Sequence, residues 1–415
     1  MFKKNLPLYL LIFFSTVLSI YFRLFDKLGT DFYLFWDSMV LYCGPYYFSL
    51  DKNPYGLINE CSDRVSNFKY VYLPIYLEWF QFFLNVSQNL FLKIWIALIT
   101  VSLLLTTLFL NKTFQFKNYF LSLLILLFGF SGIPFYGFLS GNVSIILYML
   151  CAGGILLSTK ENPTYVLIGL VLIGIPSMFK IYMLIFFLVP YLYIERKYLK
   201  YIISLCSFSS LFFFYNFYAY KKLFQEFTSN LSILPIAGDM GVGLFKIVNL
   251  INHYILNISD LYNPGRHNWN IDTTRTFNML PDYSVAILII LLFIYLATII
   301  RGYNFTSSKS ENIRIKVSLG IIISYLCLPR LKQYDFFLNT VASFYLINSD
   351  FFRSLIIKIL NVNICRNITY FLNFSLLAFY NIKGDNFFIY PFTLLLLILF
   401  IFFHRISRKT EASLS

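Results

Sequence analysis

Apolar runs recur along the whole chain, and they constrain its fold more than any other feature. Twelve of them stand at 6–24, 71–87, 90–110, 118–138, 143–159, 165–194, 199–220, 284–300, 315–329, 333–349, 366–381 and 387–404. An apolar helix of roughly 17–25 residues crosses the ~30 Å hydrocarbon core of a bilayer, where a backbone must satisfy its own hydrogen bonds. The pattern predicts an all-α polytopic membrane protein, a single integral membrane domain over 1–415 with about 12 transmembrane helices.

The composition and the placement of charge agree with this class. Hydrophobic residues make up 59% of the 415 residues and charged residues 13%, whereas soluble chains carry about 25% charged residues. The net charge of +14 comes from Lys and Arg in short loops between apolar runs, which is the positive-inside signal and not a nucleic-acid footprint. The start of the chain has Lys3 and Lys4 but no small-residue cleavage pattern, so we expect a retained first span. We predict a multi-pass protein of the plasma membrane with both termini in the cytoplasm and no nucleic-acid partner.

Strict alternation of the spans leaves two long segments on the outer face, 25–70 and 221–283. The same alternation places Gly141, which follows the fourth run, on the inner face. The sixth run, 165–194, is unusually long and contains Pro176, so we expect a kinked or partly re-entrant span there.

The six cysteines are scattered, without a Cys-x-x-Cys pair or a Cys/His cluster. This spacing predicts no structural metal site, and the absence of Gly-rich nucleotide loops predicts no nucleotide cofactor. Cys43 and Cys61 share the first outer segment, where they can pair or stay free thiols. We expect no cofactor and no metal.

Two carboxylates, Asp31 and Asp37, follow the first span among aromatic residues. An acid at the mouth of a membrane cavity is a candidate general base, because partial desolvation raises its pKa toward the working range. We assign this role to Asp31, and we expect Asp37 and Tyr33, on one helical face, to orient substrate hydroxyls. The alternative is a pair of solvated loop acids.

Two charges fall inside apolar runs, Lys180 in the sixth and Glu78 in the second. A charge at that depth is costly and usually meets a counter-ion or an anionic ligand. A lipid phosphate suits Lys180, and the alternative is a lysine that snorkels to the interface. Glu78 can pair with a lysine or take part in catalysis.

A short outward turn later in the chain carries two cations, Arg330 and Lys332, followed by Asp335. A guanidinium and an ammonium together can hold a phosphate through bidentate and point-charge contacts. The alternative is a charged cap between two spans.

These pieces, in this order over about residues 25–340, resemble glycosyltransferase family 87. The family comprises polytopic GT-C transferases, including the mycobacterial polyprenol-phosphate-mannose-dependent α-mannosyltransferases. The matching elements are Asp31 with Tyr33, Gly44 followed by Asn53-Pro54-Tyr55, Tyr70-Val71-Tyr72-Leu73-Pro74, Gly141-Asn142-Val143-Ser144, Gly174 through Lys180, and Leu328-Pro329-Arg330 to Tyr334-Asp335. Two departures concern sugar and acceptor choice: Asn142 replaces the family's frequent Gln, and Tyr334-Asp335 replaces a late His-containing element.

The resemblance implies a GT-C-like bundle with a catalytic first outer loop and an inverting, single-displacement transfer on the outer face. A hexose such as mannose would pass from a polyprenyl-phosphate donor to a glycolipid or polysaccharide acceptor within the lipid bilayer. Asp31 would be the base, the substrate would contact Tyr33, Asp37, Tyr55 and Asn142, and Lys180, Arg330 and Lys332 would hold the donor phosphate.

Two other classes fit parts of the sequence. A polytopic transporter or flippase would show charges facing each other inside the bilayer and two similar halves, and no such halves stand out. An O-antigen ligase or polymerase would use arginines and a histidine in a late outer loop, as Arg266 and His267 in 221–283 would allow. The early Asp31 loop favours the transferase.

Overall fold

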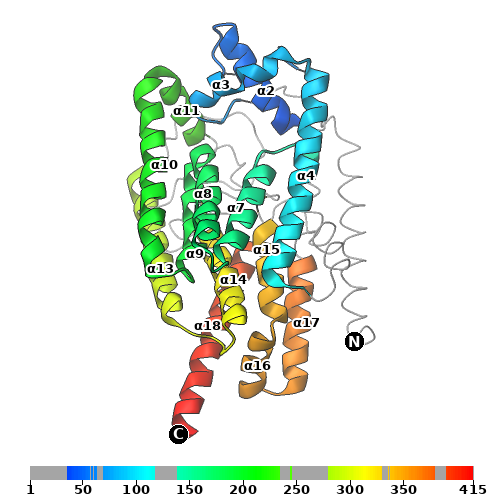
Figure 1. Cartoon of the computed structure of the whole chain (residues 1–415), viewed down its shortest axis with the longest axis vertical. Coiled ribbons are helices and arrows are strands. Elements are labelled where there is room, and N and C mark those ends of the chain that lie inside the picture. The colour runs from blue at the N-terminus through cyan, green and yellow to red at the C-terminus, as the bar shows by residue number, and fades with distance from the viewer. Residues whose placement is uncertain are drawn as a thin grey trace.

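The computed structural model describes residues 35–56, 58, 60–62, 69–116, 138–233, 244, 279–329, 335, 337–378 and 389–414. This part of the chain is a bundle of helices without a strand, which confirms the predicted all-α class for it (Figure 1). The first half holds α2 (Trp36–Ser49), α3 (Ile75–Trp79), η2 (Phe80–Asn85), α4 (Gln88–Phe114), α7 (Ser144–Ser158), α8 (Pro163–Phe179), η4 (Ile181–Phe187), α9 (Leu188–Tyr191), η5 (Arg196–Tyr198), α10 (Leu199–Ala219) and α11 (Lys221–Ile233). The second half holds α13 (Met279–Gly302), α14 (Lys309–Cys327), α15 (Phe337–Asn348), α16 (Asp350–Ile359), α17 (Val362–Ala378) and α18 (Ile389–Leu414).

Three stretches of the described chain are long and apolar enough to cross a bilayer: Gln88–Phe114, Arg196–Ala219 and Ser284–Gly302. Several other helices are apolar but shorter, such as Ser144–Ser158 and Pro163–Phe179. The helical membrane character expected from the sequence is therefore present, whereas the number of spans stays a prediction.

The run at 71–87 does not form the expected membrane span. It forms α3 of 5 residues and η2 of 6 residues, next to α2. Its helical part would extend only about 20 Å at ordinary helical rises, short of a ~30 Å core.

Ser87 then starts α4 as its N-cap by accepting a hydrogen bond from the Leu90 N–H at 3.3 Å. Glu78 is exposed and accepts a hydrogen bond from the Tyr220 hydroxyl at 2.7 Å, so it is not a buried charge.

The run at 165–194 forms a helical hairpin instead of one kinked span. α8 ends at Phe179, Lys180 is extended (φ −136°, ψ 96°), η4 packs back against α8, and α9 continues onto α14. α8 approaches α7 closely, because a Cβ built on Gly154 or on Gly169 would lie 2.6 Å from the other residue's carbonyl oxygen. Lys180 is thus at the tip of a hairpin seated on α7.

The first of these differences, at 71–87, decides where Gly141 lies. We call the end of the bundle that holds α2, α3 and α11 the α2 end, and the opposite end, which holds α16, the basic end (Figure 1). A Cβ on Gly141 would lie 3.1 Å from Ser38 Oγ of α2, and Trp95 Nε1 donates to the Gly141 carbonyl at 2.8 Å. Gly141 is therefore at the α2 end, beside the first outer segment and not opposite to it. Strict alternation was wrong here because 71–87 does not cross the bundle.

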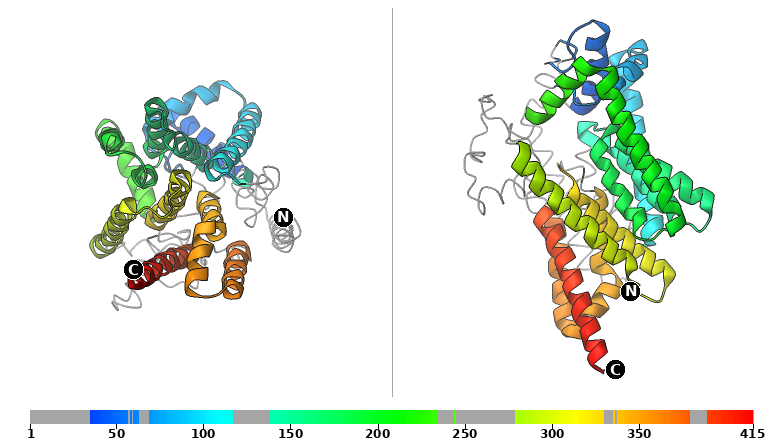
Figure 2. Two further views of the ribbon diagram at one scale, coloured as in Figure 1. Left: turned by 60° about the horizontal axis from the view of Figure 1, so that its bottom comes forward. Right: turned by 90° about the vertical axis from the view of Figure 1, so that its left-hand side faces the viewer.

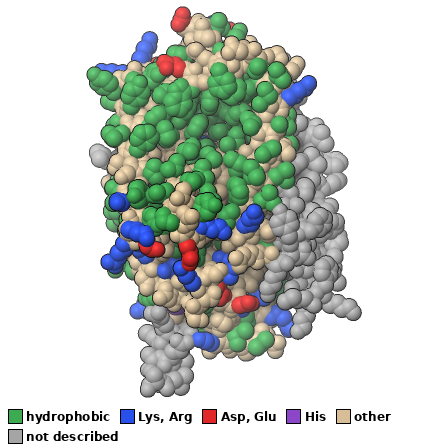
Figure 3. Space-filling view, viewed as in Figure 1, with side chains coloured by type: hydrophobic (Ala, Val, Ile, Leu, Met, Phe, Trp, Pro, Cys, Tyr) green, Lys and Arg blue, Asp and Glu red, His purple; other side chains and the backbone are tan. Residues whose placement is uncertain are grey.

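α14 lies at the centre of the molecule and joins the earlier helices to the later ones. Every residue from Ile315 to Cys327 is buried, and α14 packs on η4, α9, α13, α15 and α18. In the side view of Figure 2, the helices of the first half, α2–α11, lie next to the helices of the second half, α13–α18. Apolar side chains cover a broad outer surface above a zone rich in Lys and Arg (Figure 3).

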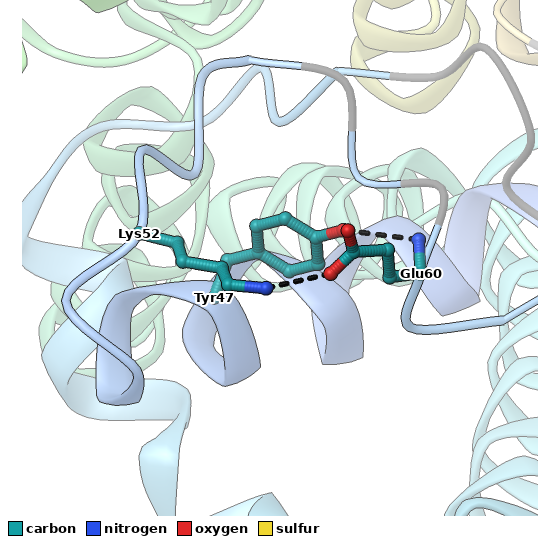
Figure 4. A network of polar contacts seen from close by, with 3 residues as sticks. All are labelled: Tyr47, Lys52 and Glu60. Atoms are coloured by element: carbon teal, nitrogen blue, oxygen red, sulfur yellow. Dashed lines mark hydrogen bonds and ion pairs between the residues drawn. The ribbon is translucent and has the colours of Figure 1, made fainter.

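Covalent and polar contacts fasten the loop that follows α2. Cys43 of α2 forms a disulfide with Cys61, whose carbonyl accepts a hydrogen bond from Gln88 at 2.8 Å. Lys52 forms an ion pair of 2.6 Å with Glu60 and lowers the pKa of that carboxyl, and the Glu60 N–H donates to the Tyr47 hydroxyl (Figure 4). An exposed ion pair contributes about 0–1 kcal/mol, whereas a disulfide closing a loop of this size contributes about 3 kcal/mol. The disulfide is the stronger restraint on this loop.

Candidate functional site

Four of the predicted site residues, Asp37, Tyr55, Asn142 and Lys180, lie in the described part of the chain. Asp31, Tyr33, Arg330 and Lys332 lie outside the described residues, and their roles stay predictions. The structure brings Asp37, Asn142 and Lys180 together at the α2 end, and it places Tyr55 apart from them.

Asp37 is fixed at the first turn of α2 against the loop before α7. The Phe35 N–H donates to the Leu139 carbonyl at 2.8 Å, and Ser38 Oγ donates to the Phe35 carbonyl at 2.7 Å. Gly141 has a φ of +70°, a left-handed conformation that glycine adopts without steric cost. This turn lets the two backbones meet and brings Asn142 to Asp37.

Asn142 joins Asp37 to the start of α7. Its Nδ2 donates to Asp37 Oδ2 at 2.9 Å, and its Oδ1 accepts from the Ser144 N–H at 2.8 Å. Because only the oxygen can accept from Ser144, the amide nitrogen must face the carboxylate. The side chain is 5% exposed, so both hydrogen bonds are shielded from water. Asn142 therefore sets the orientation of the Asp37 carboxylate.

Lys180 reaches the same place from the tip of the α8–η4 hairpin. Its Nζ donates to Ser144 Oγ at 2.5 Å, and its charge interacts with Tyr182, Asp335 and Asp37. A partly buried ammonium of this kind needs anionic neighbours to offset lost hydration. The two carboxylates supply them.

Asp335 completes the group from the segment between α14 and α15. It is 5% exposed, and its Oδ1 accepts a hydrogen bond from the Tyr148 hydroxyl at 2.9 Å. Tyr148 stands one turn after Ser144 on the same face of α7. We call Asp37, Asn142, Ser144, Tyr148, Lys180 and Asp335 the polar cluster.

Tyr55 contacts the polar cluster indirectly, through Tyr72. Its hydroxyl donates to the Tyr72 carbonyl at 2.8 Å, and Asn230 of α11 donates to the Tyr55 carbonyl at 2.7 Å. The Tyr72 side chain in turn interacts electrostatically with Asp37 and Asp335. Tyr55 is 2% exposed, and these hydrogen bonds hold its loop in place, whereas its predicted contact with substrate stays a prediction.

Sequence reasoning missed Tyr148, and it quoted Tyr72 and Asp335 within matching elements without giving either a role of its own. Tyr148 carried a usable signal, because it stands four residues after Ser144 and so shares its helical face. Nothing local ties Tyr148 to Asp335, which is 187 residues away.

The arrangement can bind a ligand that is both anionic and rich in hydroxyls. The ammonium can hold a phosphate oxygen, and a carboxylate in a fixed orientation can accept from sugar hydroxyls. An apolar cavity of ≈ 220 Å³ lies on a different face of α7, lined by Leu105, Phe109, Met149, Gly153, Leu157 and others, and it has no polar lining. We therefore place the candidate site at the polar cluster and not in that cavity.

Within the described residues, no group of three His, Cys, Asp or Glu side chains is placed to hold a metal ion. Comparison of the chain with protein-family models, with curated proteins and with solved structures gave no match.

Proposed function

We propose that this protein is an inverting membrane glycosyltransferase that moves a hexose from a polyprenyl-phosphate donor to a glycolipid or polysaccharide acceptor. The observation that supports it best is the polar cluster: Lys180, bonded to Ser144, stands beside Asp37 and Asp335 at one end of an apolar bundle. The isoprenoid chain of a lipid-carried phosphate can stay in the bilayer while its headgroup reaches such a place at the end of the bundle.

The proposal sets the α2 end on the outer face of the plasma membrane, with both termini in the cytoplasm. Two observations support this orientation. The basic end gathers most Lys and Arg of the described helices, among them Arg196, Lys197, Arg301, Lys309, Arg314, Arg353, Lys358 and Arg405. The α2 end carries the Cys43–Cys61 disulfide, and disulfides persist in oxidising compartments.

In the proposed reaction the acceptor hydroxyl oxygen attacks the anomeric carbon on the face opposite the lipid phosphate. The bond between that carbon and the phosphate oxygen breaks, and the phosphate leaves with the electron pair. Lys180 stabilises the charge on the leaving phosphate, with Arg330 and Lys332 as further predicted partners. Asp31 takes the proton of the acceptor hydroxyl. Asp37, oriented by Asn142, accepts from a hydroxyl of the bound sugar.

A transporter or flippase is the second candidate, and one observation favours it. Lys180 interacts electrostatically with the carboxylates of Asp37 and Asp335 at one end of an apolar bundle, and opposite charges grouped in a membrane domain are common in ion and substrate pathways. The ligase or polymerase reading depends on Arg266 and His267, which lie outside the described residues.

The deciding experiment offers the purified protein, reconstituted in vesicles, a polyprenyl-phosphate hexose and a nucleotide hexose in separate reactions. Mass spectrometry follows acceptor glycans, and a second readout follows movement of labelled donor across the membrane. We expect a new glycosidic bond with the lipid-linked donor alone. Transfer from the nucleotide sugar only, or movement of donor without bond formation, would reject the proposal, and the latter result would establish the transporter.

A further inference from the structure

The short segment α3–η2 carries large apolar side chains on its surface at the α2 end of the bundle (Figure 1). Trp79 is 48% exposed and Phe82 is 59% exposed, and their spacing of three residues puts both on one side of a helical segment. The polar residues Glu78 and Asn85 are exposed next to them. Exposed apolar surface marks a contact with a partner or with lipid, and tryptophan beside polar side chains is typical of the boundary between hydrocarbon and headgroups.

Two helices of membrane-spanning length adjoin this surface, each at its end. Trp79 contacts Phe212 in the last turns of α10, with ring centroids 5.9 Å apart. The Ile75 N–H donates to Asn216 Oδ1 in the same turns at 3.1 Å. On its other side η2 is followed directly by the first turn of α4. Both helices belong to stretches long and apolar enough to cross a bilayer, so α3–η2 lies at the level where two such stretches begin or end.

Both helices also keep an exposed apolar face that continues the one on α3–η2. The exposed side chains near Phe212 on α10 and on the first half of α4 are Phe208, Leu211, Phe214, Tyr215, Leu90, Ile94, Leu98 and Val101. A membrane-spanning helix presents such a face to the acyl chains of lipid. The bilayer that surrounds these two helices is therefore the partner whose chemistry fits Trp79 and Phe82.

The same segment sets the level of the hairpin tip that carries Lys180. Tyr76 of α3 is fully buried and stacks on Phe179, with ring centroids 4.4 Å apart and an angle of 8° between the ring planes. Phe179 is the last residue of α8 and directly precedes Lys180. The Tyr220 hydroxyl donates to Glu78 at 2.7 Å and fastens α3 to the end of α10. Lys180 is therefore at the level of α3, near the end of the bundle and not at its middle.

We propose that α3–η2 lies in the boundary layer between the hydrocarbon core and the headgroups of the bilayer, with Trp79 and Phe82 in contact with lipid. The partner is the lipid surface itself. This placement holds for a transferase and for a transporter alike, so it does not depend on the proposed function. It puts Lys180 at the depth of the lipid phosphates. The headgroup of a membrane lipid can then reach Lys180 while its acyl or isoprenoid chain stays in the hydrocarbon core.

The test measures quenching of tryptophan fluorescence with the full chain reconstituted in phosphatidylcholine vesicles. Every sample carries Trp269→Phe, because Trp269 lies outside the described residues. One lipid quencher has its nitroxide near the headgroup end of the acyl chain, another has it near the methyl end, and acrylamide quenches from the water. We expect the shallow nitroxide to quench more strongly than the deep one, and Trp79→Phe to abolish the larger part of that quenching.

Trp36→Phe is the matched control, because Trp36 is 6% exposed, and it should leave the quenching by both nitroxides unchanged. Phe82→Trp, added to Trp79→Phe, should restore the stronger quenching by the shallow nitroxide. If Trp79→Phe does not fold, Phe82→Trp alone should increase that quenching, and no increase would overturn the inference.

Three other results overturn the inference. Stronger quenching of the Trp79 fluorescence by the deep nitroxide would place the segment within the hydrocarbon core. Quenching by acrylamide without quenching by either nitroxide would place it in water. No quenching by any of the three would show that protein, such as a second copy of this chain, packs on the segment. None of these results bears on sugar transfer, which the reaction with the lipid-linked donor measures separately.

Discussion

Asp31→Asn is expected to lower sugar transfer by about 10²–10⁴-fold, the usual loss when a positioned general base is removed. The amide has nearly the shape of the carboxylate but cannot take the proton of the acceptor hydroxyl. Initial rates of glycosidic bond formation in reconstituted vesicles measure the effect. Asp31 precedes α2 by a few residues in the chain. The start of α2 lies beside the polar cluster, because the Phe35 N–H donates a hydrogen bond to the Leu139 carbonyl, two residues before Gly141.

Asp37→Asn is the matched control for this experiment. Asn142 orients Asp37 through a hydrogen bond from its Nδ2, and Asp37 is predicted to hold a substrate hydroxyl, so the amide should weaken substrate binding and raise KM more than it lowers kcat. Expression and membrane insertion should be normal for both variants. A rate for Asp31→Asn within a few-fold of the parent would remove Asp31 from the role of base. A collapse of kcat confined to Asp37→Asn would transfer that role to Asp37.

Lys180→Ala should weaken binding of the lipid-linked donor by about 10–100-fold, since a hydrogen bond to a charged group contributes about 1.5–3 kcal/mol. The loss arises because Lys180 is predicted to donate a charge-assisted hydrogen bond to the phosphate, and it stays within this range because Arg330 and Lys332 are further predicted partners. Donor titrations of the initial rate give the KM, and binding of the sugar-free lipid phosphate gives the Kd.

Lys200→Ala is the control, because Lys200 is an exposed lysine at the start of α10, at the basic end. It should leave both constants unchanged. Equal constants for Lys180→Ala and the parent protein would show that Lys180 is a structural cation held by Ser144. The donor phosphate would then have to bind elsewhere.

Local signals predicted most helices but not the direction in which they run. The apolar run at 71–87 has the hydropathy of a span, yet Ser87 caps a new helix directly after it, and that signal is readable in the sequence. Hydropathy reports that a segment is apolar, and it cannot tell a crossing helix from a short one lying against its neighbours. Counting 71–87 as a crossing helix therefore placed Gly141 at the wrong end of the bundle.

The hairpin at 165–194 was only partly predictable. Pro176 and Lys180 mark a break, and a partly re-entrant segment was one of the two expected outcomes. The return of η4 against α8 depends on tertiary packing, such as α9 on α14 and the close approach of Gly154 of α7 to Gly169 of α8. No single segment encodes that contact.

The members of the site were more predictable than their partners. Asp37, Asn142 and Lys180 stood out because polar residues are rare in so apolar a chain. Their pairing was not readable, since Asp37 and Asn142 are 105 residues apart and Lys180 meets Ser144 across 36. Pairings of that range follow from helix packing, which one sequence does not reveal.

The most direct measurement is a cryo-electron microscopy structure of the full chain in nanodiscs with a polyprenyl phosphate bound. We predict density for the phosphate next to Lys180 Nζ, with the isoprenoid chain leaving the bundle toward the bilayer near the α2 end. The same map should keep Asn142 bonded to Asp37. Phosphate density at the basic end, or a lipid whose headgroup stays away from the polar cluster, would contradict the account.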